Sequence, residues 1–342
     1  MVTRRMNLEE LEKIDSKKMF GVYDKWPDIA KESYEQEFLK PEFKDIDHIV
    51  FAGMGGSGTI GDVFSSVLSK NDIHTSVVKG YLLPKTVDEN TLVVVTSVSG
   101  NTQESLTILQ NSKNNKAKFI ALSSGGMIKQ YAMKNGVNYQ EIKMEHSPRA
   151  SFSKYIFATL KILELVIPVK KSDISDAISK MEIVQKNISS NNLNEENVAL
   201  NLAKWMTGIP ALYYPGGLES AAIRFKNSLQ ENSKLHVITE EVMEACHNGI
   251  VSWERKSNIQ PILIQGSDDY FKTKERWELL KEFFNSKQID YKEIFSVNGN
   301  IISKITNLIY LLDYASIYHS VISGIDPSPV SAIDFIKERL SK

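Results

Sequence analysis

Short apolar runs alternate with amphipathic stretches through the first half of the chain. Each run has the length of a strand and is bounded by small or polar residues, which predicts strands at 49–52, 74–79, 92–96, 118–122 and 138–142. The continuous apolar run at 92–95 is typical of a strand covered on both faces, as in a parallel sheet. This alternation predicts a doubly wound α/β domain, whose ligands bind at the carboxyl ends of the strands.

The same alternation returns in the second half, after a stretch that is helical from 151 to about 204. There we expect strands at 210–214, 235–238, 261–265 and 290–295, and then helices over 301–323 and 330–340. The turn Gly216-Gly217 echoes the first half weakly, consistent with a duplicated domain. We therefore predict two doubly wound parallel-sheet domains, at 1–155 with an N-terminal helical segment and at 205–342 with a C-terminal helix, joined by a helical connection at 156–204.

The composition narrows the class of protein. With 41 basic and 42 acidic residues among 342, the chain lacks the basic excess that is usual for a nucleic-acid partner. The lone Cys246 cannot form an internal disulfide, which fits a reducing compartment. The segment 1–14 is charged and helical rather than a signal peptide, and the apolar stretch 156–169 is too short and too charged to span a bilayer. We expect a soluble, cytoplasmic protein with no membrane partner.

Two loops of small residues follow the expected strands at 49–52 and 92–96. The first is Gly53-Met54-Gly55-Gly56-Ser57-Gly58, and the second is Ser97-Val98-Ser99-Gly100-Asn101-Thr102-Gln103-Glu104. Backbone N–H groups left free at a helix start, with glycines that allow close approach and hydroxyls nearby, make a phosphate site. Two such loops on neighbouring strands could hold one phosphate from two sides, so we predict a phosphate ligand.

Each loop also has an alternative interpretation. Hydroxyl residues followed by Glu104 are a common helix start, so the second loop could be an ordinary cap. The first loop satisfies G-x-G-x-x-G, a dinucleotide motif whose companion is a carboxylate near the end of the second strand. The sequence at 78–80 offers no carboxylate, although Lys79 could face a 2′-phosphate, so an NADP-binding Rossmann enzyme remains an alternative. That alternative leaves the hydroxyls of the second loop unexplained.

A second group of candidate residues lies in the second half of the chain. Glu231 is at an expected helix end, beside Arg224, Lys226 and Lys234, and His247 follows shortly after. A carboxylate and an imidazole together supply proton transfer near neutral pH. The alternatives are a solvated helix face with ordinary ion pairs and a structural histidine. Periodicity does not show whether Glu231 and His247 meet.

Six motifs, in order, resemble those of the bifunctional phosphoglucose/phosphomannose isomerases, in the superfamily built from sugar isomerase (SIS) domains. They are Gly-Gly-Ser-Gly at 55–58, Ser-x-Ser-Gly-Asn-Thr-x-Glu at 97–104, Pro148-Arg149, Glu231-Asn232-Ser233-Lys234, Glu244-x-x-His247-Asn248, and Lys337 after Asp326-Pro-Ser-Pro-Val. The resemblance covers most of the chain. It implies two flavodoxin-like SIS domains, a homodimer, and aldose–ketose isomerisation of hexose 6-phosphates without metal or cofactor, as in glycolysis and gluconeogenesis.

The resemblance also implies roles for particular residues. Glu231 would be the base that moves a proton between C1 and C2 through a cis-enediol intermediate, and Arg149 would stabilise the enediolate oxygens. His247, entering from the partner subunit as in relatives, and Lys337 would assist ring opening and closing. Protonating either face of the enediol at C2 would convert fructose 6-phosphate to glucose or mannose 6-phosphate. The sugar phosphate would be held by Gly56, Ser57, Ser97, Ser99 and Thr102.

Three positions depart from what the resemblance leads us to expect, namely Val98, Ser147 and Cys246, and they leave the sugar preference open. Cys246 beside His247 also suggests a Cys/His nucleophile, but neighbours in sequence point their side chains apart. A regulatory SIS protein that binds phosphosugars without turnover is a further alternative. Such a protein would have no use for Glu231, His247 and Lys337 together.

Overall fold

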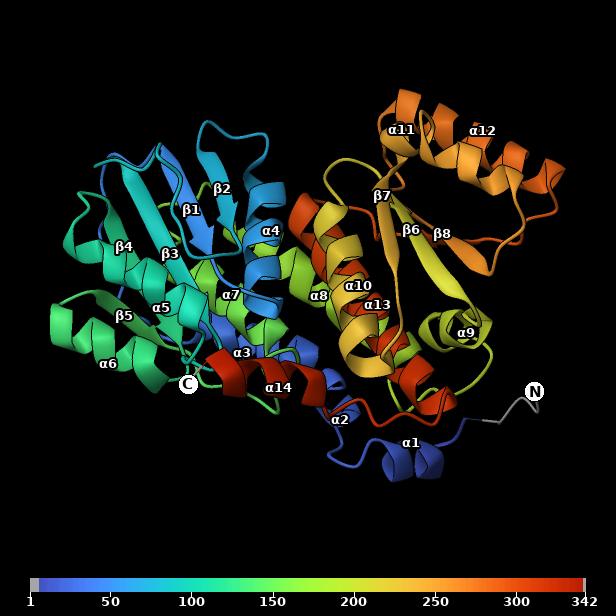
Figure 1. Cartoon of the computed structure of the whole chain (residues 1–342), viewed down its shortest axis with the longest axis horizontal. Helices are drawn as coiled ribbons and strands as arrows, with labels where there is room; N and C mark the ends of the chain where they lie inside the picture. The colour runs from blue at the N-terminus through green and yellow to red at the C-terminus, as the bar shows by residue number, and fades with distance from the viewer. Residues whose placement is uncertain (1–5, 341–342) are drawn as a thin grey trace.

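The computed structural model describes residues 6–340 and contains two parallel β-sheets flanked by helices (Figure 1). The first sheet has the strand order β2-β1-β3-β4-β5, which is the flavodoxin-like order of a doubly wound domain. The predicted fold class is confirmed, and each predicted strand of this sheet matches an observed one. The strands are β1 (His48–Ala52), β2 (His74–Val78), β3 (Thr91–Ser97), β4 (Lys118–Ser123) and β5 (Asn138–Glu141).

The second sheet has the order β7-β6-β8-β9 and is also parallel. Its strands are β6 (Ile209–Tyr214), β7 (Ile238–Glu241), β8 (Ile259–Gln265) and β9 (Lys292–Phe295). The strand predicted at 235–238 was placed too early. Leu235 and Val237 pack against the core as part of the connection, whereas the strand itself is the polar edge segment that follows. An edge strand without an apolar run gives no strong sequence signal.

Helices cover the sheets and connect the two halves. In the first half they are α1 (Leu8–Ile14), α2 (Phe20–Tyr23), α3 (Trp26–Glu35), α4 (Gly56–Leu68), α5 (Gln103–Gln110), α6 (Gly126–Asn135) and α7 (Phe152–Ile162). The remainder are α8 (Lys171–Ile188), α9 (Val198–Trp205), α10 (Glu219–Ser233), α11 (Val242–Ala245), α12 (Phe271–Ser286), α13 (Ile301–Ile322) and α14 (Ser331–Leu340), with 3-10 turns at Asn111–Lys113 and Gly249–Glu254. Of the helical segment expected over 1–14, α1 is observed, and residues 1–5 lie outside the described residues.

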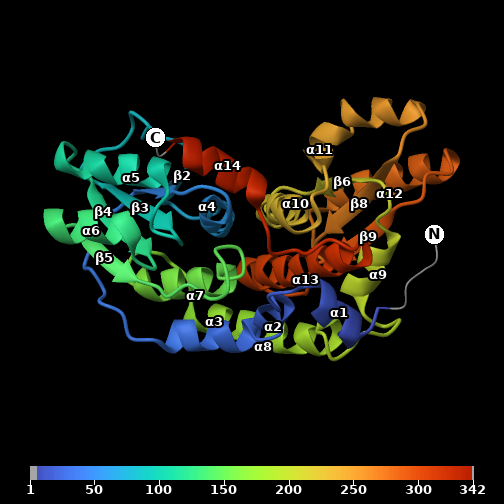
Figure 2. The ribbon, with the colours of Figure 1, turned by 60° about the horizontal axis from the view of Figure 1, so that its bottom comes forward.

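Helix α13 is the centre of the core, buried around its circumference for most of its length. It lies between the two sheets, with α8, α9 and α10 against it (Figure 2). Its aromatic side chains also reach the N-terminal segment: the rings of Tyr310 and Trp26 stack at 5.6 Å, and the Tyr310 hydroxyl donates to the carbonyl of Tyr23 at 2.8 Å. Among the described residues, no helix is both long and apolar enough to cross a bilayer.

The two halves meet where α10 packs against α4. The amide of Asn227 on α10 donates to the hydroxyl of Thr59 on α4, at 3.2 Å. Because α4 begins at the first glycine loop, this contact brings a helix of the second half to the predicted phosphate site. The interface between the two halves therefore lies beside the first loop, 53–58.

Candidate active site

The two predicted phosphate loops lie side by side. Strands β1 and β3 are parallel neighbours, with Ala52 opposite Val95, so the loops that follow them start from adjacent strand ends. The backbone N–H of Val98, in the second loop, donates to the Oγ of Ser57, in the first, at 3.4 Å. Loops on neighbouring strands were expected from the sequence, and this contact joins them into one surface.

The second loop, 97–104, which we call the hydroxyl loop, does not cap the helix that follows it through a side-chain hydrogen bond. Thr102 occupies the N-cap position of α5, yet its side chain makes no capping hydrogen bond. Its Oγ1 lies instead 2.8 Å from the Oγ of Ser97, and the Oγ of Ser99 accepts from the N–H of Asn101 at 3.3 Å. The capping alternative is therefore wrong for Thr102. Its hydroxyl pairs with a strand-end hydroxyl, so the two hydroxyls lie together at the start of the loop.

Gly100 allows the hydroxyl loop to pack tightly on the loop after β4. Its φ of 70° is in the left-handed region, and a Cβ at this position would lie 1.9 Å from the carbonyl oxygen of Gly125. Two backbone bonds fix the contact: the N–H of Ser124 donates to Val98 O at 3.2 Å, and that of Ile128 donates to Gly100 O at 2.9 Å. Val98 itself is buried, so its departure from the expected pattern concerns the core beneath the loop.

Arg149 and Glu231 form an ion pair between the two halves of the chain. Arg149 precedes α7 and is buried, and its Nη1 donates to Glu231 Oε2 at 3.0 Å. Its Nη2 donates to the carbonyl oxygens of Pro327 and Ser328, at 2.5 and 2.9 Å. The guanidinium is thus held by three acceptors, and it connects α10 to the segment that leads into α14.

Glu231 combines partial exposure with a fixed position near the end of α10. Its side chain is 26% exposed, so the carboxylate remains accessible beside Arg149. Lys234 ends the helix in a left-handed conformation, and its Nζ donates to the carbonyls of Glu231 and Pro329 at 2.6 and 2.8 Å. Burial, with the nearby Arg149 charge, lowers the pKa of the Lys234 ammonium. Lys234 therefore links the end of α10 to the segment just before α14.

Lys337 lies on α14, which begins just after the carbonyls bound by Arg149 and Lys234. The side chains of α14 are exposed throughout the helix. In Figure 1 the helix lies below α4, at the lower side of the molecule. That Lys337 reaches the sugar stays a prediction. It is supported by the start of α14, which is held beside the Arg149–Glu231 pair.

His247 lies at the other end of α10 from Glu231. Helix α10 begins after the carboxyl end of β6, and β7 runs parallel to β6, so the chain returns to the start of α10 before it reaches α11 and His247. From Glu219 to Glu231 the helix rises about 18 Å. Figure 1 shows α11 at the top of the molecule, away from α14. Within a single chain, His247 and Glu231 therefore lie near opposite ends of α10 and do not meet.

Cys246 does not fit a nucleophile activated by His247. Burial, the largest cause, raises the pKa of its thiol, and the nearby Glu240 and Glu241 raise it further while Arg276 opposes them. A nucleophilic cysteine needs the thiolate, which a raised pKa disfavours. The alternative considered for this pair therefore has no support from the surroundings of the thiol.

A buried ion pair, which the sequence interpretation missed, lies behind Arg149. Arg224 and Asp313 are 1% and 0% exposed, with Arg224 Nη2 donating to Asp313 Oδ2 at 2.6 Å. The same Nη2 donates to the backbone carbonyl of Arg149 at 2.8 Å, and the guanidinium lies 4.3 Å from the ring centroid of Phe152. Burial raises the pKa of Asp313, and the charge and hydrogen bonds of Arg224 oppose this. The available signal was a single aspartate inside the apolar run of α13.

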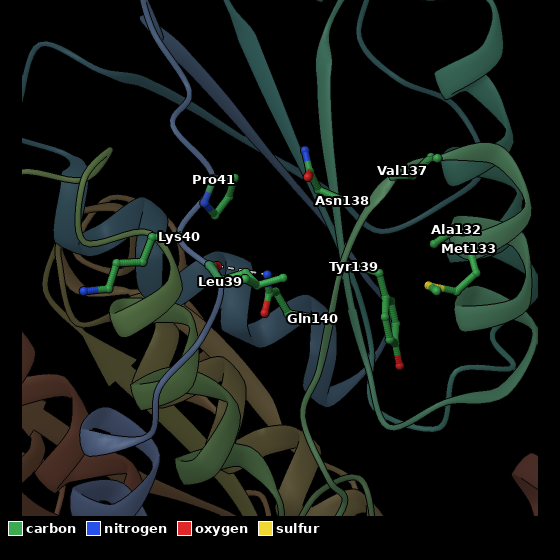
Figure 3. Close-up of a pocket in the computed structure, with 10 residues that line it drawn as sticks. Leu39, Lys40, Pro41, Ala132, Met133, Val137, Asn138, Tyr139 and Gln140 are labelled. Carbon is green, nitrogen blue, oxygen red and sulfur yellow. Dashed lines mark hydrogen bonds between the residues drawn. The ribbon is translucent and has the colours of Figure 1, made fainter.

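Two pockets of the described chain are lined by other residues. One has a volume of about 370 Å³ and lies between 39–41 and β5, where Gln140 Nε2 donates to the carbonyl of Leu39 at 2.9 Å (Figure 3). The other, of about 1370 Å³, is lined by Lys234 and His319 among others. None of the predicted catalytic or phosphate-binding residues lines either pocket. The candidate site is therefore defined by the two loops and the Arg149–Glu231 pair.

The fold and the paired loops define a protein built from sugar isomerase domains. Residues 42–159 match the family model of the SIS domain, and residues 195–340 match that of the bacterial phospho-glucose isomerase C-terminal SIS domain. The chain belongs to the family of bifunctional phosphoglucose/phosphomannose isomerases. The member from Caldicellulosiruptor bescii is 31% identical over 338 residues, covering 95% of this chain and 99% of that protein.

Two further comparisons agree with this family and fold. The bifunctional phosphoglucose/phosphomannose isomerase of Aquifex aeolicus is 30% identical over 329 residues, covering 94% of this chain and 97% of that protein. Among solved structures, the C-terminal domain of glucosamine-fructose-6-phosphate aminotransferase from Francisella tularensis superposes with a TM-score of 0.67. It shares 13% sequence identity and covers 90% of this chain and 96% of its own, a likeness of fold alone.

Proposed function

We propose that the protein interconverts glucose 6-phosphate and mannose 6-phosphate with fructose 6-phosphate. The observation that carries the proposal is the Arg149–Glu231 pair at 3.0 Å, at the seam where α10 meets the first phosphate loop. A carboxylate beside a fixed guanidinium suits a reaction in which a proton is moved and negative charge develops on neighbouring oxygens. Family membership, through relatives whose names carry both sugar phosphates, gives independent support.

Glu231 acts as the base in this proposal. Its carboxylate takes the proton from C2 of the aldose or C1 of the ketose and returns it to the neighbouring carbon, through a cis-enediol. Arg149 stabilises the oxygens of that intermediate. Its Nη2 is already held by the carbonyls of Pro327 and Ser328, so the guanidinium needs little reorganisation when charge develops. Preorganised donors of this kind commonly contribute several kcal/mol, roughly 3 to 4 for one donor.

The two loops anchor the phosphate in this proposal. The backbone at Gly56 and the hydroxyl of Ser57 lie at the start of α4, where free N–H groups and the helix dipole favour an anion. The second loop adds the hydroxyls of Ser97, Ser99 and Thr102. The contact between Ser57 and Val98 supports a single ligand for both loops.

The site is completed by a second copy of the chain. Within one chain His247 lies beyond the opposite end of α10, so we propose a homodimer in which the partner supplies this imidazole. His247 and Lys337 then transfer protons to and from the ring oxygen and the anomeric hydroxyl, which is on C1 in the aldoses and on C2 in fructose 6-phosphate, during ring opening and closing. Protonation of the enediol on either face of C2 accounts for both aldoses. The reaction requires neither metal nor cofactor, and it fits a cytoplasmic enzyme of glycolysis and gluconeogenesis.

Coupled assays test the proposal directly. Purified protein should convert fructose 6-phosphate to both glucose 6-phosphate and mannose 6-phosphate, with rates unchanged by EDTA. Binding of fructose 6-phosphate without formation of either product would contradict the proposal and favour the regulatory alternative. Tight binding of NADPH, measured by its fluorescence, would instead revive the nucleotide alternative.

A further inference from the structure

Arg224 is the most fully enclosed arginine of the described chain, and its position is fixed from several sides. It projects from α10 and is 1% exposed. Its Nε donates to Asp313 Oδ2 at 2.9 Å, and its Nη2 donates to Asp313 Oδ2 and to the carbonyl of Arg149. The remaining lone pairs of Asp313 are also used, since the hydroxyl of Ser228 donates to its Oδ1 at 2.6 Å.

The third nitrogen of this guanidinium has a different environment. Nη1 has no hydrogen-bond acceptor among the described residues, and it lies 3.2 Å from the position that a Cβ on Gly56 would take. Gly56 is the first residue of α4, in the loop predicted to hold the sugar phosphate. Unlike Arg149 Nε, Arg224 Nη1 is not a buried atom without a partner, so water or a ligand can reach it from the side of the loop. Its N–H groups are therefore charged donors available to an incoming anion.

We infer that Arg224 is a substrate-binding residue, whose Nη1 donates to the phosphate of the bound sugar beside Gly56. A phosphate oxygen is the acceptor that a charged guanidinium N–H prefers, and the helix start at Gly56 favours the same anion. The identity of the sugar rests on the proposed function, whereas the phosphate contact rests on the geometry of Arg224 and Gly56. The phosphate is then held by both halves of the chain, through the two loops and through α10.

Asp313 has a defined part in this arrangement. It neutralises Arg224 in the core and fixes the guanidinium plane, so that Nη1 faces the loop before a ligand arrives. An arginine held in this way loses little side-chain entropy on binding. Asp313 is therefore a positioning residue, and Arg224 is the residue that contacts the ligand.

The main test is Arg224→Lys, which keeps a charge opposite Asp313 but lacks the Nη1 branch. We expect the dissociation constants of inorganic phosphate and of fructose 6-phosphate, measured by calorimetry, to rise roughly ten- to a hundredfold. KM should rise by a similar factor, with a smaller fall in kcat. Lys226→Met is the matched control, because Lys226 is a half-buried cation on the same helix. This control should bind phosphate as the wild type does.

Unchanged phosphate affinity in a folded Arg224→Lys protein, with a loss confined to kcat, would overturn the inference and leave Arg224 acting only through Arg149. If that variant melts early, Arg224→Met combined with Asp313→Asn removes both charges of the buried pair, a change that proteins often tolerate. Crystals of the wild type with fructose 6-phosphate provide an independent measurement. An Nη1–phosphate oxygen distance longer than about 3.5 Å would overturn the inference.

The outcomes separate this inference from the proposed function. If the wild type isomerises fructose 6-phosphate but its phosphate affinity does not depend on Arg224, the proposed function stands and this inference fails. If the wild type binds phosphate through Arg224 but forms no aldose, this inference stands and the proposed function fails.

Discussion

Arg149 Nη1 lies 3.0 Å from Glu231 Oε2, although the two residues belong to different halves of the chain. The pair joins the loop before α7 to the end of α10, and Arg149 also binds the two carbonyls that precede α14. Three segments distant in sequence therefore converge on one ion pair. Isomerase chemistry at this point would depend on all three being held together.

Replacing Glu231 by glutamine should abolish catalysis while keeping the fold. Glutamine can still accept from Arg149, but it cannot take a proton from carbon, so kcat should fall at least about a thousandfold. The affinity for fructose 6-phosphate, measured by calorimetry, should stay near that of the wild type. Glu182→Gln, an exposed glutamate on α8, should be fully active. Retained activity in Glu231→Gln would sink the proposed mechanism.

Mixing two inactive variants should restore activity if His247 acts across the dimer. Glu231→Gln and His247→Ala proteins are each expected to be inactive. A mixed dimer would have one site with both changes and one intact site, so random exchange of subunits should recover about a quarter of wild-type activity. Subunits are exchanged by mild denaturation and refolding of the mixture. No recovery, with dimers shown to exchange, would mean that each chain uses its own His247.

Removing the hydroxyl of Thr102 should weaken substrate binding. Thr102→Val preserves the shape of the side chain but loses the oxygen that lies 2.8 Å from Ser97 Oγ. We expect KM for fructose 6-phosphate to rise about tenfold, with a smaller change in kcat, because the phosphate contact is made in both ground and transition states. Thr107→Val, on the same helix, is the control and should leave KM unchanged. Equal kinetics for both variants would remove Thr102 from the phosphate site.

Gly100→Ala should destabilise the protein far more than Gly136→Ala does. Both glycines have positive φ, at 70° and 67°, but only the Cβ at 100 meets another atom, 1.9 Å from Gly125 O. We expect a cost of about 3 kcal/mol or more for Gly100→Ala, against about 1 kcal/mol for Gly136→Ala. Denaturant unfolding of the two variants measures the difference. Equal losses of unfolding free energy would mean that the hydroxyl loop does not pack on the loop after β4 as described.

His319 should make the protein less stable in mild acid. Burial lowers the pKa of its imidazole below the ordinary 6.5, and donation from Nε2 to the carbonyl of Met206, at 3.2 Å, opposes that only in part. Below pH 6.5 the unfolded chain then binds the proton more readily than the folded one, so stability present at neutral pH is lost as the pH falls. His319→Gln keeps an N–H donor without the titration. Its melting temperature should fall less between neutral pH and mild acid, and an equal fall would contradict this explanation.

Much of the fold could be predicted because its central strands, such as β1 and β3, are apolar runs between turn residues. The run at 92–95 became β3, and the first sheet has the expected parallel order. The strand β7 was misplaced because its sequence, Ile-Thr-Glu-Glu, is that of a polar edge strand. The neighbouring loops were also foreseen, since loops after adjacent parallel strands must share an edge.

The electrostatic core of the site could not be predicted in the same way. Arg224 and Asp313 are 89 residues apart, and nothing in the local pattern of either helix indicates the other. The position of His247 is a different case. Its distance from Glu231 follows from the order of β6, α10 and β7, so it depends on topology rather than on periodicity.

The position of α13 has a consequence for how the chain is made. Trp26 and Tyr23, near the N-terminus, are covered by Tyr310 and its neighbours, which leave the ribosome almost three hundred residues later. Until α13 has been synthesised, the aromatic face of the N-terminal segment lacks its native cover. Phe152 of α7 stacks on Trp26 once the first half has been made, but the face of these rings that contacts Tyr310 has no native neighbour until α13, the penultimate helix of the described residues, is complete.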